Sequence, residues 1–178
     1  KTVQLLALLA HRRHGPALLI CPLSVLGNWQ REAARFTPGL RVRVLHGADR
    51  PEAADLVDGA DLVLTTYATA TRDADALARI SWDRVVLDEA QHVKNSASEA
   101  ARAVRRFDAR SRVALTGTPV ENRLAELWSI LDFLNPGLFG SAATFRNRYA
   151  VPIERYGDED AATRLRLATR PYLLRRVK

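Results

Sequence analysis

The chain contains one cysteine and no methionine among its 178 residues. A single cysteine excludes an internal disulfide, and Cys21 ends the apolar run Ala17–Cys21, where a thiol usually behaves as a small buried hydrophobe. We therefore expect neither a redox nor a zinc-binding role for it. Because methionine is absent, Lys1 is not expected to be a natural start, and we interpret the chain as a piece of something longer.

Long hydrophobic runs are also missing. No apolar stretch approaches the roughly 20 residues that a helix needs to cross a bilayer. The start of the chain is basic and then apolar, but it reaches His11-Arg12-Arg13 without a small-residue cleavage site, which argues against a signal peptide. We therefore expect a cytoplasmic protein that has no membrane partner.

Hydrophobic residues make up 47% of the chain and charged residues 26%, values typical of a folded globular protein of about one domain. The net charge of +7 is distributed unevenly. Residues 1–145 carry 18 basic and 16 acidic side chains, whereas residues 146–178 carry 9 and 4. Such a basic excess attracts phosphate backbones, or it is simply a solvated surface, and the composition leaves both interpretations open.

Two hydrophobic periodicities alternate along the chain. Short apolar runs predict strands at 17–21, 42–45, 62–65, 84–88 and 112–115. Apolar steps of three and four residues, with a capping-box pattern at Ser96–Glu99, predict helices at 2–11, 24–36, within 71–80, 96–107, 124–134, 141–150 and 159–170. Parallel strands need crossover helices, so this alternation predicts an α/β fold with a mainly parallel central sheet covered on both faces.

In parallel sheets of this kind, ligands bind beyond the carboxyl ends of the strands. Five polar segments stand at such ends or, at the chain start, before a helix, and we expect them to meet at one rim. They are Lys1-Thr2, Pro22-Leu23-Ser24, Thr65-Thr66-Tyr67, Asp88-Glu89 and Thr116-Gly117-Thr118.

The segment Arg84–His92 is an apolar run that stops at two adjacent carboxylates. This pattern suits an ATPase that carries its metal at the end of a central strand. In that interpretation Asp88 holds Mg2+, directly or through water, and Glu89 orients the water that attacks the γ-phosphate. The alternative is a buried strand that ends in a solvated turn.

Four segments resemble the Swi/Snf-type helicase-like ATPases of superfamily two. Residues 20–29 (ICPLSVLGNW), 88–95 (DEAQHVKN) and 115–122 (LTGTPVEN) are similar to motifs Ia, II and III of that family, and residues 170–178 resemble the segment where the family leaves its first RecA-like lobe. Order and spacing agree over nearly the whole chain, and residues 152–159 resemble bacterial members. The resemblance implies a RecA-like three-layer sandwich whose first strand and phosphate-loop glycines are absent from this chain.

Carried over to this chain, the resemblance makes Lys1 and Thr2 the end of a GxGKT-type phosphate-binding loop, with Lys1 on the β- and γ-phosphates and the Thr2 hydroxyl on Mg2+. Judged without the family, Lys1 and Thr2 are only a solvated chain end. The catalytic residues would be Lys1, Asp88 and Glu89.

The family also implies coupling residues between nucleotide and DNA, which here are Gln91, His92, Thr116, Gly117 and Thr118. Thr118 could equally be a helix N-cap with Pro119 as the first helical residue and Glu121 completing a second capping box, and His92 could be an ordinary surface residue.

Donors to a DNA backbone would be Ser24, Asn28, Thr66 and Lys94, which hold the duplex without reading bases. Ser24 could instead be a helix N-cap. Trp29 and Tyr67 are predicted to belong to the core rather than to stack on bases, since Trp29 lies on the apolar face of helix 24–36.

The resemblance therefore implies an ATPase lobe at 1–136 and a helical, basic segment at 137–178 that leads toward a second RecA-like lobe. The implied activity is ATP- and Mg2+-dependent translocation on double-stranded DNA, by a bacterial, nucleoid-associated protein that remodels protein–DNA complexes and so has a DNA-bound protein as a further partner. Two alternatives stay open: a strand-separating helicase, and a DNA- or protein-binding module without hydrolysis. Without the second lobe and its arginine, the isolated chain is expected to be essentially inactive.

Overall fold

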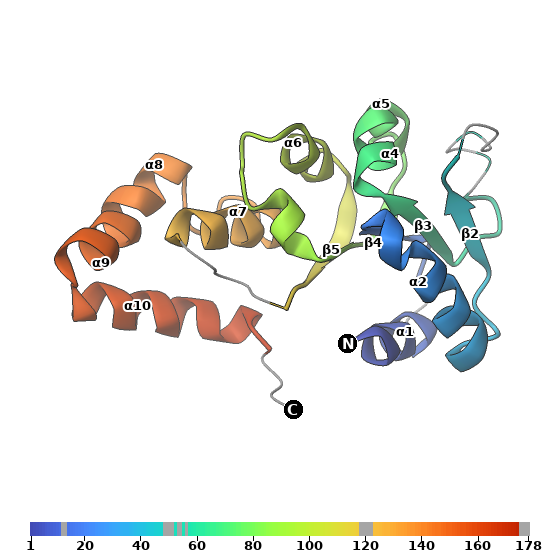
Figure 1. The fold of residues 1–178 in the computed structure, drawn as a ribbon, viewed down its shortest axis with the longest axis horizontal. Coiled ribbons are helices and arrows are strands. Elements are labelled where there is room, and N and C mark those ends of the chain that lie inside the picture. The colour runs from blue at the N-terminus through green and yellow to red at the C-terminus, as the bar shows by residue number, and fades with distance from the viewer. Residues whose placement is uncertain (12–13, 48–51, 53–54, 56, 118–122, 175–178) are drawn as a thin grey trace.

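The computed structural model describes residues 1–11, 14–47, 52, 55, 57–117 and 123–174. Its centre is a five-stranded sheet in the order β2-β3-β1-β4-β5, in which every pairing is parallel. The strands are β1 (Ala17–Cys21), β2 (Val42–Leu45), β3 (Leu62–Thr66), β4 (Trp82–Asp88) and β5 (Ala109–Leu115). The predicted α/β fold with a parallel sheet is confirmed (Figure 1).

Helices cover both faces of the sheet because alternate strand residues point to opposite sides. On one face, α1 (Thr2–His11) and α2 (Leu23–Phe36) pack against residues such as Leu19 and Val86. On the other face, α4 (Tyr67–Arg72), α5 (Ala74–Leu77), α6 (Glu99–Arg105) and α7 (Leu124–Leu134) pack against residues such as Val85 and Leu87. This arrangement is the predicted three-layer sandwich.

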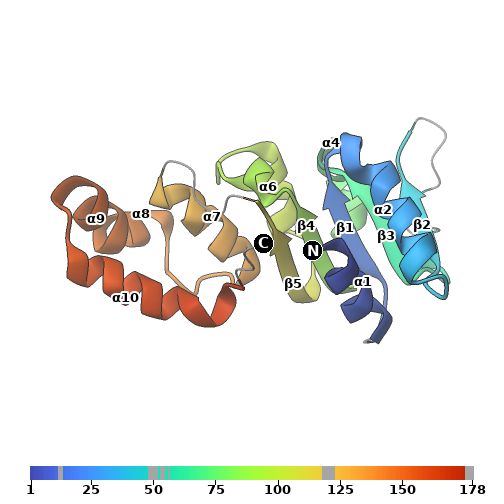
Figure 2. The same ribbon diagram turned by 60° about the horizontal axis from the view of Figure 1, so that its bottom comes forward.

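A helical segment follows α7 and extends away from the sheet in both views (Figures 1 and 2). It comprises α8 (Ala142–Phe145), the π-helical turn η2 (Arg146–Ala150), α9 (Val151–Tyr156), α10 (Glu159–Thr169) and the short 3-10 turn η3 (Arg170–Tyr172). Its own core consists of Phe145, Tyr149 and Leu165 packed against Leu127 and Leu131 of α7. Helix α7 is thus shared between two cores, and the division at residue 136, just after α7, stays a prediction.

The helix expected within 71–80 is confirmed as α5. It is preceded by α4, which was not predicted and which begins at Tyr67 because Thr66 caps it by accepting a hydrogen bond from the Thr69 amide. One predicted helix start was wrong: α6 begins at Glu99 and not at Ser96, because the capping side chain is Ser98, which accepts from the Ala101 amide. The two serines compete for the same capping role, and periodicity does not choose between them.

Two further differences concern helix length and strand edges. The helix predicted at 141–150 continues through η2 and α9 to Tyr156. In the described part of the chain β5 is an edge strand, and its residues are half-buried apart from exposed Arg110, whereas those of β4 are buried apart from half-buried Asp88. Among the described residues no helix combines the length and apolarity that crossing a bilayer requires.

Candidate active site

The candidate site lies at the carboxyl edge of the sheet, where β4 ends. Val85, Val86 and Leu87 are fully buried, so the strand continues to the edge of the core and delivers half-buried Asp88 and Glu89 there. The indole Nε1 of Trp29 donates to Asp88 Oδ2 at 2.8 Å, and the Glu89 amide donates to Asp88 Oδ1 at 3.0 Å. The Asp88 carboxylate therefore has a fixed orientation.

Glu89 has a left-handed backbone, with φ 50° and ψ 55°, which is unique among the described non-glycine residues. A β-carbon makes this conformation unfavourable, so a non-glycine residue held there often marks a functional position. The turn starts the short 3-10 helix η1 (Ala90–Val93), and the two acidic side chains have different partners, Trp29 for Asp88 and Gln91 for Glu89. Glu89 Oε2 accepts from the Gln91 amide nitrogen at 2.7 Å.

Gln91 connects Glu89 to the end of β5. Its side-chain oxygen accepts from the Thr116 hydroxyl at 2.9 Å, and the Thr116 carbonyl in turn accepts from Lys1 Nζ at 2.5 Å. Four predicted residues from three distant segments are thus linked in one hydrogen-bonded chain. Gly117 follows as an exposed residue, whereas Thr118 lies outside the described residues, as do Pro119 and Glu121.

Tyr67 and His92 form a second contact at this edge. Their rings stack with centroids 4.8 Å apart and planes 20° apart, and the Tyr67 hydroxyl donates to the Asp88 carbonyl at 2.9 Å. Burial, followed by the charge of Asp88, raises the pKa of Tyr67, so its phenol remains a neutral hydrogen-bond donor. His92 itself is exposed, which suits a partner-facing residue and an ordinary surface residue equally.

Cys21, at the end of β1, is fully buried. Burial, with a contribution from Asp88, raises the pKa of its thiol to about 12. The thiol is therefore protonated at neutral pH and is a poor nucleophile. The prediction that Cys21 is a small core residue is confirmed.

The predicted DNA-backbone donors lie in different settings. Ser24 and Asn28 are exposed on α2, whose N-cap is Pro22, so the alternative that Ser24 caps this helix was wrong. Asn28 donates to Glu32 at 2.9 Å. Lys94 is 3.5 Å from Glu126 of α7 and keeps 39% of its side chain exposed.

Thr66, the fourth predicted donor, differs from the other three. It is 4% exposed, and its hydroxyl accepts from the Thr69 amide and donates to the Thr69 hydroxyl at 3.0 Å. Its hydroxyl is therefore occupied in capping α4.

The donor set suits Mg2+ better than a softer metal. Asp88 and Glu89 supply carboxylates, and Thr2, the first residue of α1, supplies a hydroxyl at the same chain end as Lys1. Within the described ranges no group of three or more His, Cys, Asp or Glu side chains could hold a metal by itself. Mg2+ is commonly bound by one or two carboxylates together with substrate phosphates, so this donor set fits a nucleotide-bound ion.

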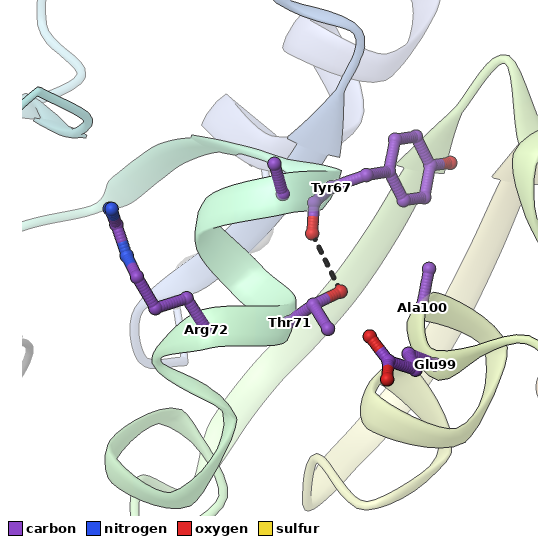
Figure 3. Close-up of a pocket in the computed structure, with 6 residues that line it drawn as sticks. Tyr67, Thr71, Arg72, Glu99 and Ala100 are labelled. Atoms are coloured by element: carbon purple, nitrogen blue, oxygen red, sulfur yellow. Dashed lines mark hydrogen bonds between the residues drawn. The ribbon is translucent and has the colours of Figure 1, made fainter.

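A separate open cavity of about 470 Å3 lies between α4 and α6 (Figure 3). Its lining residues are Tyr67, Ala68, Thr71, Arg72, Glu99 and Ala100. The Thr71 hydroxyl in it donates to the Tyr67 carbonyl at 2.8 Å, a bond within α4. The cavity shares Tyr67 with the site but none of the predicted nucleotide ligands.

Sequence reasoning missed Trp29 and Tyr67 as partners of Asp88. Both were predicted to be core residues, and they are 2% and 8% exposed. The available signal was the polar end of each ring, because a buried indole N–H or phenol O–H needs a hydrogen-bond partner.

The sheet is fully parallel, and its carboxyl edge carries the acidic pair Asp88 and Glu89 together with Lys1 and Thr116. This combination defines a RecA-like ATPase lobe. The SNF2-related domain family model matches residues 1–178, and the chain belongs to that family.

The chain is similar to YwqA of Bacillus subtilis, named as an ATP-dependent helicase/translocase, with 44% identity over all of this chain and 20% of that protein. It is 37% identical to the ISWI chromatin-remodeling complex ATPase ISW2 of Saccharomyces cerevisiae, over all of this chain and 17% of that protein. The SWI2/SNF2 ATPase core of Sulfolobus solfataricus in complex with double-stranded DNA has a TM-score of 0.89 and 43% identity, covering 99% of this chain and 37% of that one. The chain thus spans about a fifth of the length of these curated relatives.

Proposed function

We propose that this chain is the first ATPase lobe of a DNA-dependent ATPase that translocates on double-stranded DNA and remodels protein–DNA complexes. The observation that supports the proposal is a hydrogen-bond network at the carboxyl edge of the sheet. It joins Asp88, Glu89, Gln91, Thr116 and Lys1. Support for the DNA partner comes from family membership and from the DNA-bound structure of the Sulfolobus relative.

In this proposal the substrate is ATP and the reaction is phosphoryl transfer to water. Lys1 would neutralise charge on the β- and γ-phosphates, and Asp88 and Thr2 would hold Mg2+, which when bound supplies charge stabilisation on the phosphates. Glu89 would orient the attacking water, and its strained backbone and its separate hydrogen-bond partner, Gln91, support a role different from that of Asp88.

Through their hydrogen bonds, Gln91 and Thr116 would transmit a change in the position of Glu89 to the end of β5 and to Gly117. Their hydrogen bond, together with that from Gln91 to Glu89, is the physical basis for assigning them to coupling. Thr118 and His92 are included in this role on the family resemblance alone.

Catalysis also requires groups that this lobe does not supply. A second RecA-like lobe would contribute an arginine to the transferred phosphate, so an isolated chain of these 178 residues would hydrolyse ATP negligibly. A nucleoid-associated, cytoplasmic setting is part of the same proposal.

The test is Glu89→Gln in the full-length protein. DNA-stimulated ATP hydrolysis should fall by at least about 100-fold while ATP binding is retained, because the carboxamide keeps the shape of the side chain but not its charge. Glu159→Gln, an exposed change in the first turn of α10, is the matched control and should leave hydrolysis unchanged. Unchanged hydrolysis in Glu89→Gln would refute the proposal.

Translocation is separated from strand separation by a second assay. A translocase should displace a triplex-forming strand from duplex DNA in an ATP-dependent way without unwinding the duplex. Efficient displacement of an annealed oligonucleotide would instead favour a strand-separating helicase, and a Glu89→Gln protein with full cellular function would favour a binding module.

A further inference from the structure

Asp88 is held from both faces of the sheet by aromatic side chains. Trp29 reaches it from α2, which covers one face, and Tyr67 reaches it from the start of α4, which covers the other. The first contact is to a carboxylate oxygen and the second is to the backbone carbonyl of the same residue. Both the side chain and the backbone of Asp88 are therefore fixed by rings from outside β4.

The Trp29 contact differs from those of the other two tryptophans. Trp82 Nε1 donates to the Leu77 carbonyl at 3.1 Å, and Trp128 Nε1 donates to the Gly140 carbonyl at 3.2 Å. Only Trp29 donates to a side-chain carboxylate, at the shorter distance of 2.8 Å. Hydrogen bonds to ionised acceptors are shorter and roughly twice as strong as neutral ones.

The two aromatic residues belong to the segments that also carry predicted DNA contacts. Helix α2 buries Trp29 and exposes Ser24 and Asn28. Tyr67 directly follows Thr66, the N-cap of α4, and its ring stacks on exposed His92. A small shift of either segment would move a donor bonded to Asp88, because packed cores transmit displacements and do not absorb them.

We propose that Trp29 and Tyr67 are positioning residues that couple contact of α2 and the β3–α4 junction with a DNA backbone to the orientation of Asp88. This inference rests on the proposed function. It gives DNA stimulation a physical route, because the phosphate backbone would be bound by two elements whose buried aromatic side chains hold the side chain and the backbone carbonyl of Asp88.

The test uses Trp29→Phe and Tyr67→Phe in the full-length protein, with Trp82→Phe as the matched control. Each change removes one donor and keeps an aromatic ring, and Trp82 is as buried as Trp29 but bonds only a helix carbonyl. In Trp29→Phe the ratio of DNA-stimulated to basal hydrolysis should fall about tenfold, as is usual when a partner of a metal ligand is removed. Tyr67→Phe should lower the same ratio to a smaller extent, since its bond is to the backbone.

A readout independent of turnover is the binding of a fluorescent ATP analogue as Mg2+ is titrated, in proteins that also carry Glu89→Gln. The Mg2+ concentration for half-maximal binding should rise about tenfold when Trp29→Phe is added and stay unchanged when Trp82→Phe is added. Thermal melting confirms that each variant is folded. If Trp29→Phe does not fold, Tyr67→Phe alone decides the proposal.

Aromatic variants that match Trp82→Phe in both the DNA ratio and the Mg2+ titration would overturn the coupling role. That failure is distinct from failure of the proposed function. If Glu89→Gln abolishes hydrolysis while the aromatic variants behave like the control, the ATPase assignment stands and only the coupling inference is lost.

Discussion

The hydroxyl of Thr116 lies 2.9 Å from the side-chain oxygen of Gln91 and donates to it. This bond joins the end of β5 to the turn that follows β4, across 25 residues of sequence. Since Gln91 also donates to Glu89, the hydroxyl is two hydrogen bonds from the predicted catalytic carboxylate. A movement at the end of β5 would therefore alter the hydrogen bonds of Gln91, the partner of Glu89.

Thr116→Val in the full-length protein should lower kcat for DNA-stimulated hydrolysis by about threefold to tenfold, with little change in the KM for ATP. Valine keeps the shape of threonine but removes the donor, and a bond of this kind contributes roughly 0.5–1.5 kcal/mol. Steady-state kinetics with saturating DNA measure the effect. Thr169→Val in α10, which loses a hydroxyl bonded to the Leu165 carbonyl, is the control. A raised KM with unchanged kcat would contradict the coupling role.

Lys94→Gln should weaken DNA binding by the full-length protein equally on different sequences and should reduce its dependence on salt. Removing one phosphate contact lowers the slope of log K against log salt by about 1. The charge-matched control is Arg79→Gln, which lies on the exposed connection between α5 and β4, at the amino edge of the sheet. Fluorescence anisotropy at several salt concentrations measures both. Equal slopes for Lys94→Gln and wild type would exclude a phosphate contact.

Arg112→Met should destabilise the protein by about 2 kcal/mol. Arg112 donates to the carbonyls of Phe133 and Phe107, both at 2.9 Å, and thereby ties β5 to the ends of α7 and α6. Burial lowers its pKa, yet arginine stays protonated, so the change leaves polar carbonyls without their charged donor. Urea unfolding measures the loss. Arg43→Met, at an exposed position of β2, should change stability by less than about 0.5 kcal/mol, and an equal loss in both variants would contradict the role of Arg112.

The fold and the position of the site could be predicted from sequence because both depend on local pattern. Apolar runs of four or five residues gave strands such as Ala17–Cys21 and Val42–Leu45 with correct bounds. Parallel pairing then brings their carboxyl ends to one edge, where the structure places Asp88 and Thr116 at the ends of adjacent strands. Family resemblance implied roles for these residues, and those roles stay predictions.

The contacts inside the site could not be predicted in the same way. Trp29 and Asp88 are separated by 59 residues, and their hydrogen bond depends on how α2 is rotated and placed on the sheet. Periodicity assigns Trp29 to the buried face but does not say which atom its indole reaches. Which of two nearby serines, Ser96 or Ser98, caps α6 likewise depends on the backbone geometry, and the sequence pattern is compatible with both.

Cys21 makes stability depend on pH in the alkaline range. Its thiol has a pKa of about 12 in the folded protein, whereas an unfolded thiol titrates near about 8.5. Between these values the unfolded chain loses its proton first, so the free energy of unfolding must fall as pH rises. The stabilising contribution of the protonated thiol is fully present below the pKa of the unfolded thiol. Tyr67, whose pKa burial also raises, acts in the same direction at higher pH.

Cys21→Ala should therefore lose stability less steeply than the wild type between about pH 8.5 and about pH 10.5. The lower limit is roughly the pKa of an unfolded thiol, and the upper limit stays below the pKa of folded Cys21. The variant should also lose about 1 kcal/mol at every pH, because a buried sulfur is removed. Urea unfolding at several pH values separates the two effects, since the first changes the slope and the second only the offset. Parallel curves for wild type and Cys21→Ala would mean that the thiol titrates alike in both states, and that the carboxyl end of β1 is open to water next to Asp88.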